Sequence, residues 1–193
     1  MSFNVELVAN LVSQLKKAGF ADSEVEKLSE LDKLTEIKAL LDGSVEITPK
    51  QHIIDCDVPP FIPAGWTCDP KDHIKGGKLL FDPEKTTFYL SEKQKDASWI
   101  DGNELRKELV GKLVLNANVL DYLLKNPQII PESWKKDEKA RTRYIYFWGT
   151  IYHDSYGSSF VRYLYFSYDS WDWGFSWFRN GFVGLEPALL GII

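Results

Sequence analysis

The chain has 193 residues and a mass of 22.2 kDa, which suits one ordinary domain with a small appendage. With 44% hydrophobic and 26% charged residues it has the composition of a globular protein, and its net charge of −5 makes nucleic acid an unfavoured partner. Two cysteines are too few for a disulfide scaffold, and no signal-peptide or membrane-spanning pattern is present, so we expect a soluble cytoplasmic protein that does not bind membranes.

Residues 1–43 are predicted to form a separate segment of three small helices. Apolar residues recur at spacings of three and four between Val5 and Leu15, the pattern of a one-sided amphipathic helix. Ser23, followed by an acid three residues later, has the spacing of a capping box and indicates the start of a second helix. Asp32 is expected to cap a third.

Residues 44–193 are predicted to form an α+β domain. The first part, residues 44–90, contains six of the nine prolines, so short strands are expected there rather than long helices. Two or three central helices follow, with a third turn expected from about Pro131. One is expected to begin at Gly102, and another to be capped by Asn116.

The C-terminal part is rich in aromatic residues, because 17 of the 27 lie between Tyr144 and Phe182. Three strands of an antiparallel meander are predicted at about 143–153, 160–168 and 171–179. Both faces of the first strand are apolar. Either helices cover one face of this sheet and a ligand or partner covers the other, or the chain buries both faces.

Two cysteines and two histidines form the candidate metal set: His52, Cys56, Cys68 and His73. Their ligand types suit tetrahedral zinc, but pairing a Cys with a His in each half differs from the usual zinc finger. We therefore favour a buried Cys56 and surface histidines, and we expect no metal or other cofactor.

Asp55 and Asp57 flank Cys56 and would share one face of an extended segment. Together with His52 they support the alternative hypothesis of a metal-dependent hydrolase or nuclease. Acidic pairs in proline-rich loops are more often turn formers. A hydrolytic triad at His153 is not expected, because no Gly-x-Ser-x-Gly elbow is present to place a nucleophile.

Tryptophans near the C-terminus form the candidate binding face. Those of the third predicted strand alternate at period two and would line one side of it, where they could stack on a ring-bearing ligand, engage a protein partner, or serve as core. The candidate residues are Trp148, Arg162, Trp171, Trp173, Trp177 and Arg179.

Four segments resemble a family of uncharacterised bacterial and metagenomic proteins: GNELRKEL at 102–109, GKLVLNANVLDYLL at 111–124, NPQIIPESW at 126–134 and FWGTIY at 147–152. The likeness extends from about His52 to the C-terminus and leaves the N-terminal helices poorly matched. It implies that residues 44–193 form one family domain, and it brings no activity and no catalytic residue.

The sequence thus predicts an α+β protein in which the central helices pack on a C-terminal antiparallel sheet. The favoured hypothesis is a non-enzymatic binding or interaction protein that uses the aromatic sheet face to engage a protein partner or a small ligand. A homo-oligomer is a further prediction. It rests on the apolar tail Leu189, Leu190, Ile192 and Ile193, which could dock on a second subunit.

Overall fold

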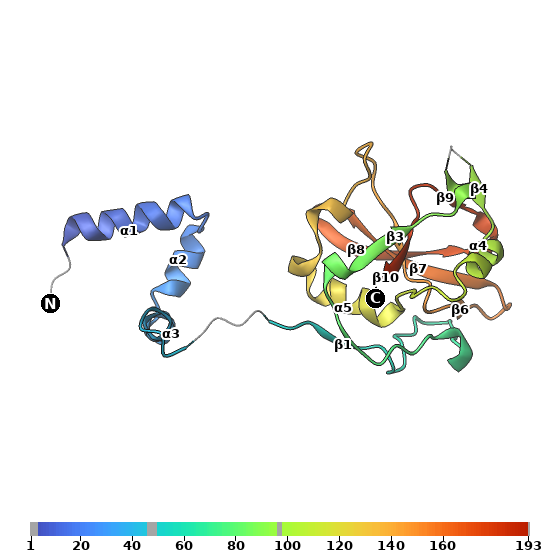
Figure 1. Cartoon of the computed structure of the whole chain (residues 1–193), viewed down its shortest axis with the longest axis horizontal. Helices are drawn as coiled ribbons and strands as arrows, with labels where there is room; N and C mark the ends of the chain where they lie inside the picture. The colour runs from blue at the N-terminus through green and yellow to red at the C-terminus, as the bar shows by residue number, and fades with distance from the viewer. Residues whose placement is uncertain (1–3, 46–49, 96–97, 193) are drawn as a thin grey trace. The chain divides into compact units, whose positions relative to one another are not determined.

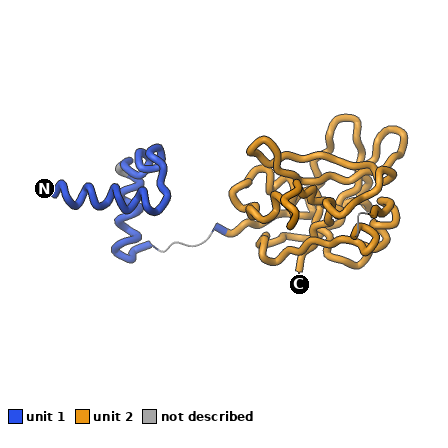
Figure 2. The backbone as a smooth tube through the Cα atoms, turned by 90° about the horizontal axis from the view of Figure 1, so that it is seen from above, with its two compact units in different colours: residues 1–50 blue, residues 51–193 orange. Residues whose placement is uncertain are grey.

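The computed structural model describes residues 4–45, 50–95 and 98–192. The chain forms two compact units, residues 1–50 and residues 51–193 (Figure 2). Within the described ranges, no helix combines the length and the apolar character needed to cross a membrane.

The N-terminal unit consists of three helices, as predicted: α1 (Val5–Lys17), α2 (Asp22–Leu28) and α3 (Leu31–Leu41). Asn4 caps α1, since its side chain accepts the N–H of Glu6 at 2.9 Å.

The predicted caps of the other two helices were each wrong by two residues, since the N-caps are Ala21 and Glu30. α2 begins before Ser23, because the carboxylate of Glu24 accepts the N–H of Ala21 at 2.8 Å and stabilises an earlier start. α3 begins at Leu31, so Asp32 lies in its first turn, where an acid still interacts favourably with the helix dipole.

The second unit is an α+β domain, which confirms the predicted fold class (Figure 1). Its helices and strands among the described residues are β1 (Ile53–Asp55), β2 (Lys78–Leu80), β3 (Thr86–Tyr89), β4 (Trp99–Ile100), α4 (Gly102–Glu108), α5 (Ala117–Lys125), β5 (Ile145–Tyr146), β6 (Tyr152–His153), β7 (Ser159–Ser167), β8 (Ser170–Trp177), β9 (Phe182–Val183) and β10 (Ala188–Gly191), with short 3-10 turns between them.

The main sheet has six strands in the order β3, β10, β5, β7, β6, and β8 also pairs with β7. All pairs are antiparallel except β10 with β5. The β7–β8 hairpin was predicted within two residues at each end. Its two-residue loop, Tyr168 and Asp169, has positive φ at both positions, the geometry that matches the twist of paired strands.

The single strand predicted at 143–153 is instead two short strands, β5 and β6, separated by a turn at residues 147–151. Gly149 lies against the backbone of Asn116, so closely that a Cβ there would come within 2.8 Å of the Asn116 Cα. The chain leaves the sheet to reach the start of α5, and a local pattern of alternating residues could not reveal that contact.

Both faces of the sheet are buried within the chain. On one face α5 packs Val119, Leu120 and Leu123 into a core with sheet residues such as Leu164 and Leu189. The other face carries a second core, to which α4 contributes. The expectation that the central helices cover the sheet is confirmed, and they do so from opposite sides.

The C-terminal tail belongs to this sheet. Leu189 and Leu190 lie in β10, between β3 and β5, with exposed fractions of 0% and 8%. They are core residues rather than a surface for a second subunit, contrary to the reasoning from sequence. Ile192 is exposed, and Ile193 lies outside the described residues.

Candidate functional site

The tryptophans of β8 lie on the face of the sheet that α5 covers, where all three are partly buried. Trp171 and Trp173 pack against the α5 core, and Trp177 packs against a smaller cluster around Phe160. Trp66, from the loop before His73, contacts Trp173 edge to face at a centroid distance of 6.2 Å. These side chains therefore contribute to packing, and the sheet face they form is largely covered by the chain itself.

Arg162 is buried under the same face, with an exposed fraction of 1%. Its guanidinium donates two hydrogen bonds to Asp121 of α5, at 2.8 and 3.3 Å, and stacks over the Trp173 ring at 4.1 Å. Its Nε is buried without an acceptor among the described residues. The predicted ligand-binding arginine thus joins α5 to the sheet.

The other predicted binding residues lie apart from this group. Trp148 is 4% exposed and packs with Phe178 and Phe182 in the core on the opposite face of the sheet. Arg179 is exposed and lies 5.6 Å from the ring centroid of Trp177. The structure therefore brings Arg162 and Trp173 together, but the six predicted residues do not share one surface.

The four predicted metal ligands do not converge. His52 hydrogen-bonds the Tyr122 hydroxyl at 3.0 Å, whereas the ring of His73 is buried between Thr150 and the carbonyl of Cys56, at 2.8 and 3.1 Å. Burial lowers the pKa of His73, so it is the neutral imidazole that the Cys56 carbonyl and the Thr150 hydroxyl hold. His73 is thus a buried structural residue, not a surface one.

The carboxylates of Asp55 and Asp57 act in turns. Asp55 accepts the N–H of Asp57 at 3.0 Å, and Asp57 accepts the N–H of Gly77 at 2.9 Å. Both oxygens stabilise the loops around β1 and β2, as turn-forming acids do.

One metal-like group does occur in the described part of the chain: Asp69, Asp72 and His153. Asp72 is buried and already has two cationic or polar partners, since His153 Nε2 lies 2.9 Å from one oxygen and Arg106 donates to the other. Burial opposes the charge on Asp72, but these hydrogen bonds outweigh it and hold its pKa below the usual value. The Arg106 guanidinium already supplies a positive charge to one oxygen of Asp72.

Ser159 completes a hydrogen-bonded series with His153 and Asp72, because its Oγ lies 3.2 Å from His153 Nδ1. The three residue types, and the order in which they are hydrogen-bonded, Asp to His to Ser, resemble a hydrolytic triad. Ser159, however, does not line any of the three cavities described below, and Arg106 compensates the charge of Asp72. This group therefore connects β6, β7, α4 and the loop at residues 69–73, and neither Ser159 nor His153 lines any of the three cavities.

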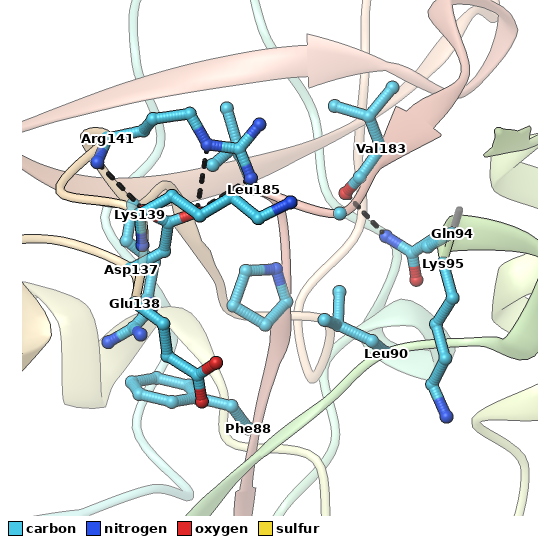
Figure 3. A pocket seen from close by; sticks show the side chains of 13 residues that line it. Phe88, Leu90, Gln94, Lys95, Asp137, Glu138, Lys139, Arg141, Val183 and Leu185 are labelled. Carbon is cyan, nitrogen blue, oxygen red and sulfur yellow. Dashed lines mark hydrogen bonds and ion pairs between the residues drawn. The ribbon is translucent and has the colours of Figure 1, made fainter. Parts of the chain in front are cut away.

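The largest of the three cavities, about 640 Å³, lies between β3, the turn at 137–143 and the segment before β10 (Figure 3). Several of its polar side chains already have partners. Arg141 makes an ion pair with Asp137 at 2.7 Å, Lys95 pairs with Glu92 at 2.6 Å, and Gln94 donates to the Val183 carbonyl. These polar groups of its lining are therefore already paired.

A second cavity, of about 400 Å³, has a different chemistry, and we call it the lysine-rimmed pocket. Its floor is formed by core residues, among them Phe81 and Leu115, and by the thiol of Cys56. Four aliphatic side chains converge on it while remaining half exposed, with exposed fractions between 50% and 53%: Ile74, Leu80, Leu113 and Ile192. A single exposed leucine is ordinary, but four around one hollow form an apolar patch of the kind that marks binding sites.

The rim of this pocket is basic. Lys75, Lys85 and Lys112 line it, and among the described residues none of the three makes an ion pair with a carboxylate. Lys112 lies 4.7 Å from the Tyr89 ring centroid. The one lining acid, Asp82, is occupied as the cap of a 3-10 turn, accepting the N–H of Glu84 at 3.0 Å.

Cys56 gives the pocket no nucleophile. Burial, with the nearby charges of Asp57 and Asp55, raises the pKa of this thiol to about 11. The thiolate needed for covalent chemistry is therefore scarce at neutral pH. Besides Cys56, the titratable residues lining the pocket are its three lysines and Asp82.

A third cavity, of about 260 Å³, adjoins the lysine-rimmed pocket and shares with it Ile74, Lys112 and Val114. It is lined also by the Arg106 and Asp72 pair.

Comparisons with protein-family models, with curated proteins and with solved structures give no match.

The lysine-rimmed pocket was not predicted from sequence, because its lining comes from five segments between Cys56 and Ile192. The sequence holds one indirect signal. Lys75 and Lys112 each lie next to an aliphatic side chain that turns out to be half exposed, Ile74 and Leu113.

Proposed function

We propose that residues 51–193 form a non-catalytic binding domain whose lysine-rimmed pocket takes a small amphiphilic anion, with an aliphatic body and a carboxylate or similar head group. The observation that carries this proposal is the combination of four half-exposed aliphatic side chains with three lysines free of ion pairs among the described residues. A volume of about 400 Å³ falls in the range of small-molecule sites, which are mostly apolar with a few polar groups that orient the ligand.

Binding rather than catalysis is supported by the titratable groups of the pocket. Its thiol is held neutral, its carboxylate caps a turn, and no histidine lines it. General acid-base or nucleophilic chemistry needs a group with a pKa near neutrality or an activated nucleophile. The hydrolase alternative at His52, Asp55 and Asp57 gains no support from these contacts.

The charge of the ligand follows from the rim. An aliphatic anion would place its head group beside Lys75, Lys85 and Lys112 and its body against Leu113 and the apolar floor. A neutral analogue loses the ionic contacts, and a cationic analogue is repelled.

Isothermal titration calorimetry with the full chain tests the proposal, using decanoate, decanol and decyltrimethylammonium as probes. We expect decanoate to bind most tightly, with an affinity that falls as NaCl is raised. Lys75→Glu combined with Lys112→Glu should weaken decanoate binding by about tenfold, since two exposed ionic contacts of about 0.7 kcal/mol each sum to about 1.4 kcal/mol.

Lys78→Glu is the matched control, because Lys78 is an exposed lysine of β2 that does not line the pocket. It should leave the decanoate affinity within about twofold. Equal binding of all three probes, or equal losses in the Lys78 variant and the rim variant, would contradict the proposal.

A further inference from the structure

One tryptophan of the domain has a buried donor without an acceptor. Trp148 is 4% exposed, and its indole Nε1 is buried without a hydrogen bond to any described residue. A buried indole N–H usually has a partner, because a donor that is buried unpaired costs free energy. The same side chain lines the third cavity, of about 260 Å³. The structure thus puts a side chain with an unused donor in the wall of that cavity.

The third cavity also has an excess of positive charge. Lys71, Arg106 and Lys112 line it, together with a single acid, Asp72. Both carboxylate oxygens of Asp72 already have partners, because one accepts from Arg106 and the other lies 2.9 Å from His153 Nε2. Three basic side chains therefore meet one carboxylate that is already hydrogen-bonded.

These basic side chains keep donors to spare. The guanidinium of Arg106 has several N–H groups, and Asp72 is its one hydrogen-bond acceptor among the described residues. Lys112 makes no ion pair in the described part of the chain. Lys71 lies 3.5 Å from Asp69, but both side chains are largely exposed, so this pair is weak. A ligand that satisfies such a cavity is negatively charged and rich in acceptors.

We propose that the third cavity binds a phosphate group, either as inorganic phosphate or as the head group of a phosphate monoester. A tetrahedral oxyanion presents acceptor oxygens in several directions, so donors from different walls can reach it. The volume of about 260 Å³ is smaller than that of most sites for drug-sized molecules, which suits a small group. Leu109, Val114 and Ile151 add apolar surface, which strengthens ionic contacts by keeping water away.

This site is distinct from that of the aliphatic anion. The two cavities adjoin and share Ile74, Lys112 and Val114, whereas Arg106 and Trp148 line the third cavity alone. The phosphate site therefore stands or falls separately from the lysine-rimmed pocket.

NMR of the full chain with isotope-labelled tryptophan tests the proposal, with sodium phosphate as the probe at constant ionic strength. The indole N–H signal of Trp148 is the one that is absent from the Trp148→Phe variant. We expect phosphate to move this signal downfield with saturation, because an oxygen that accepts the hydrogen bond deshields the proton. The other indole signals should change little.

A matched pair of charge reversals tests the cations without disturbing a buried group. Lys71 and Lys107 are both exposed, but Lys107 lines none of the three cavities. Lys71→Glu should weaken phosphate binding by about tenfold, and Lys107→Glu by less than about twofold. Decanoate does not depend on Lys71, so its affinity for the Lys71→Glu variant should stay within about threefold, and failure of either site is then seen on its own.

Decyl phosphate distinguishes the two sources of the group. Binding at least about tenfold tighter than that of either inorganic phosphate or decanoate identifies the head group of an amphiphile that spans both cavities, and an affinity equal to that of inorganic phosphate identifies the free ion. The proposal is overturned if the Trp148 indole signal shows no saturable change up to about 50 mM phosphate. It is also overturned if acetate at the same ionic strength gives the same change, or if the Lys71 and Lys107 variants lose affinity equally.

Discussion

The ion pair between Arg162 and Asp121 offers a direct test of how α5 is held on the sheet. Arg162 is 1% exposed and the Asp121 side chain is 21% exposed, so Asp121→Ala would leave a buried guanidinium without its counter-charge. Breaking a buried pair by removing one partner costs about 3 to 5 kcal/mol. Since water can approach Asp121, we expect the lower end, about 3 kcal/mol, or a melting temperature lower by roughly 10 °C.

Urea unfolding followed by tryptophan fluorescence measures this loss in the correct unit, because all seven tryptophans lie at residue 66 or beyond. Asp121→Leu combined with Arg162→Met removes both charges and should lose less stability than Asp121→Ala alone. The reasoning is refuted if Asp121→Ala costs under about 1 kcal/mol, the range of exposed pairs, or if the double variant is the less stable of the two.

Three further predictions concern packing, pH and reactivity. Gly149→Ala should lower the free energy of unfolding by about 1 to 3 kcal/mol, because the new Cβ would overlap Asn116. In the control Gly76→Ala the new Cβ lies 3.5 Å from that of Cys56, so the change should stay within about 0.5 kcal/mol. Equal urea midpoints for the two variants would contradict this. Burial lowers the pKa of His73, so the unfolded chain takes up a proton near pH 6.5 while the folded chain does not. The stability that the neutral His73 contributes is complete above about pH 7 and is lost as the pH falls below 6.5. Between pH 7.5 and 5.5 the urea midpoint of the His73→Gln variant should therefore fall less steeply than that of the unchanged protein. An equal fall in both would contradict a lowered pKa for His73. Iodoacetamide should alkylate Cys56, with its pKa of about 11, at least about tenfold more slowly at pH 8 than in urea-unfolded chain, and similar rates would show an accessible thiolate.

Elements defined by local signals could be predicted from the sequence. Asn116 caps α5 as expected, with its side chain accepting the N–H of Asn118 at 3.1 Å. The β7–β8 hairpin follows from two alternating runs joined by a two-residue turn. In these cases the residues that determine the structure lie within a few positions of one another.

Elements defined by distant contacts could not be predicted. β10 pairs with β3 and with β5, which lie about 100 and about 40 residues earlier in the chain, so its four residues looked like a free apolar tail. Cys56 was correctly expected to be buried, but its position on the floor of a pocket depends on Leu115 and Ile192. The same holds for Asp72, whose partners are Arg106 and His153.

The tryptophan-rich strand shows why an aromatic pattern is ambiguous. Period-two alternation places Trp171, Trp173 and Trp177 on one face, but the pattern is the same whether that face binds a ligand or a helix. Here Asp121 and the apolar residues of α5 take the place that a ligand would need. The half-exposed aliphatic side chains of the lysine-rimmed pocket, by contrast, have no covering element among the described residues.

The most direct measurement is methyl NMR of the full chain with isoleucine and leucine methyl groups labelled, titrated with decanoate. The account predicts saturable shift changes at Ile74, Leu80, Leu113 and Ile192, with little change at leucines of the α5 core such as Leu164. Changes centred on Leu164, which pairs with Trp173 of β8, or on Leu185 of the largest cavity, or no saturable change at all, would contradict the proposed binding site.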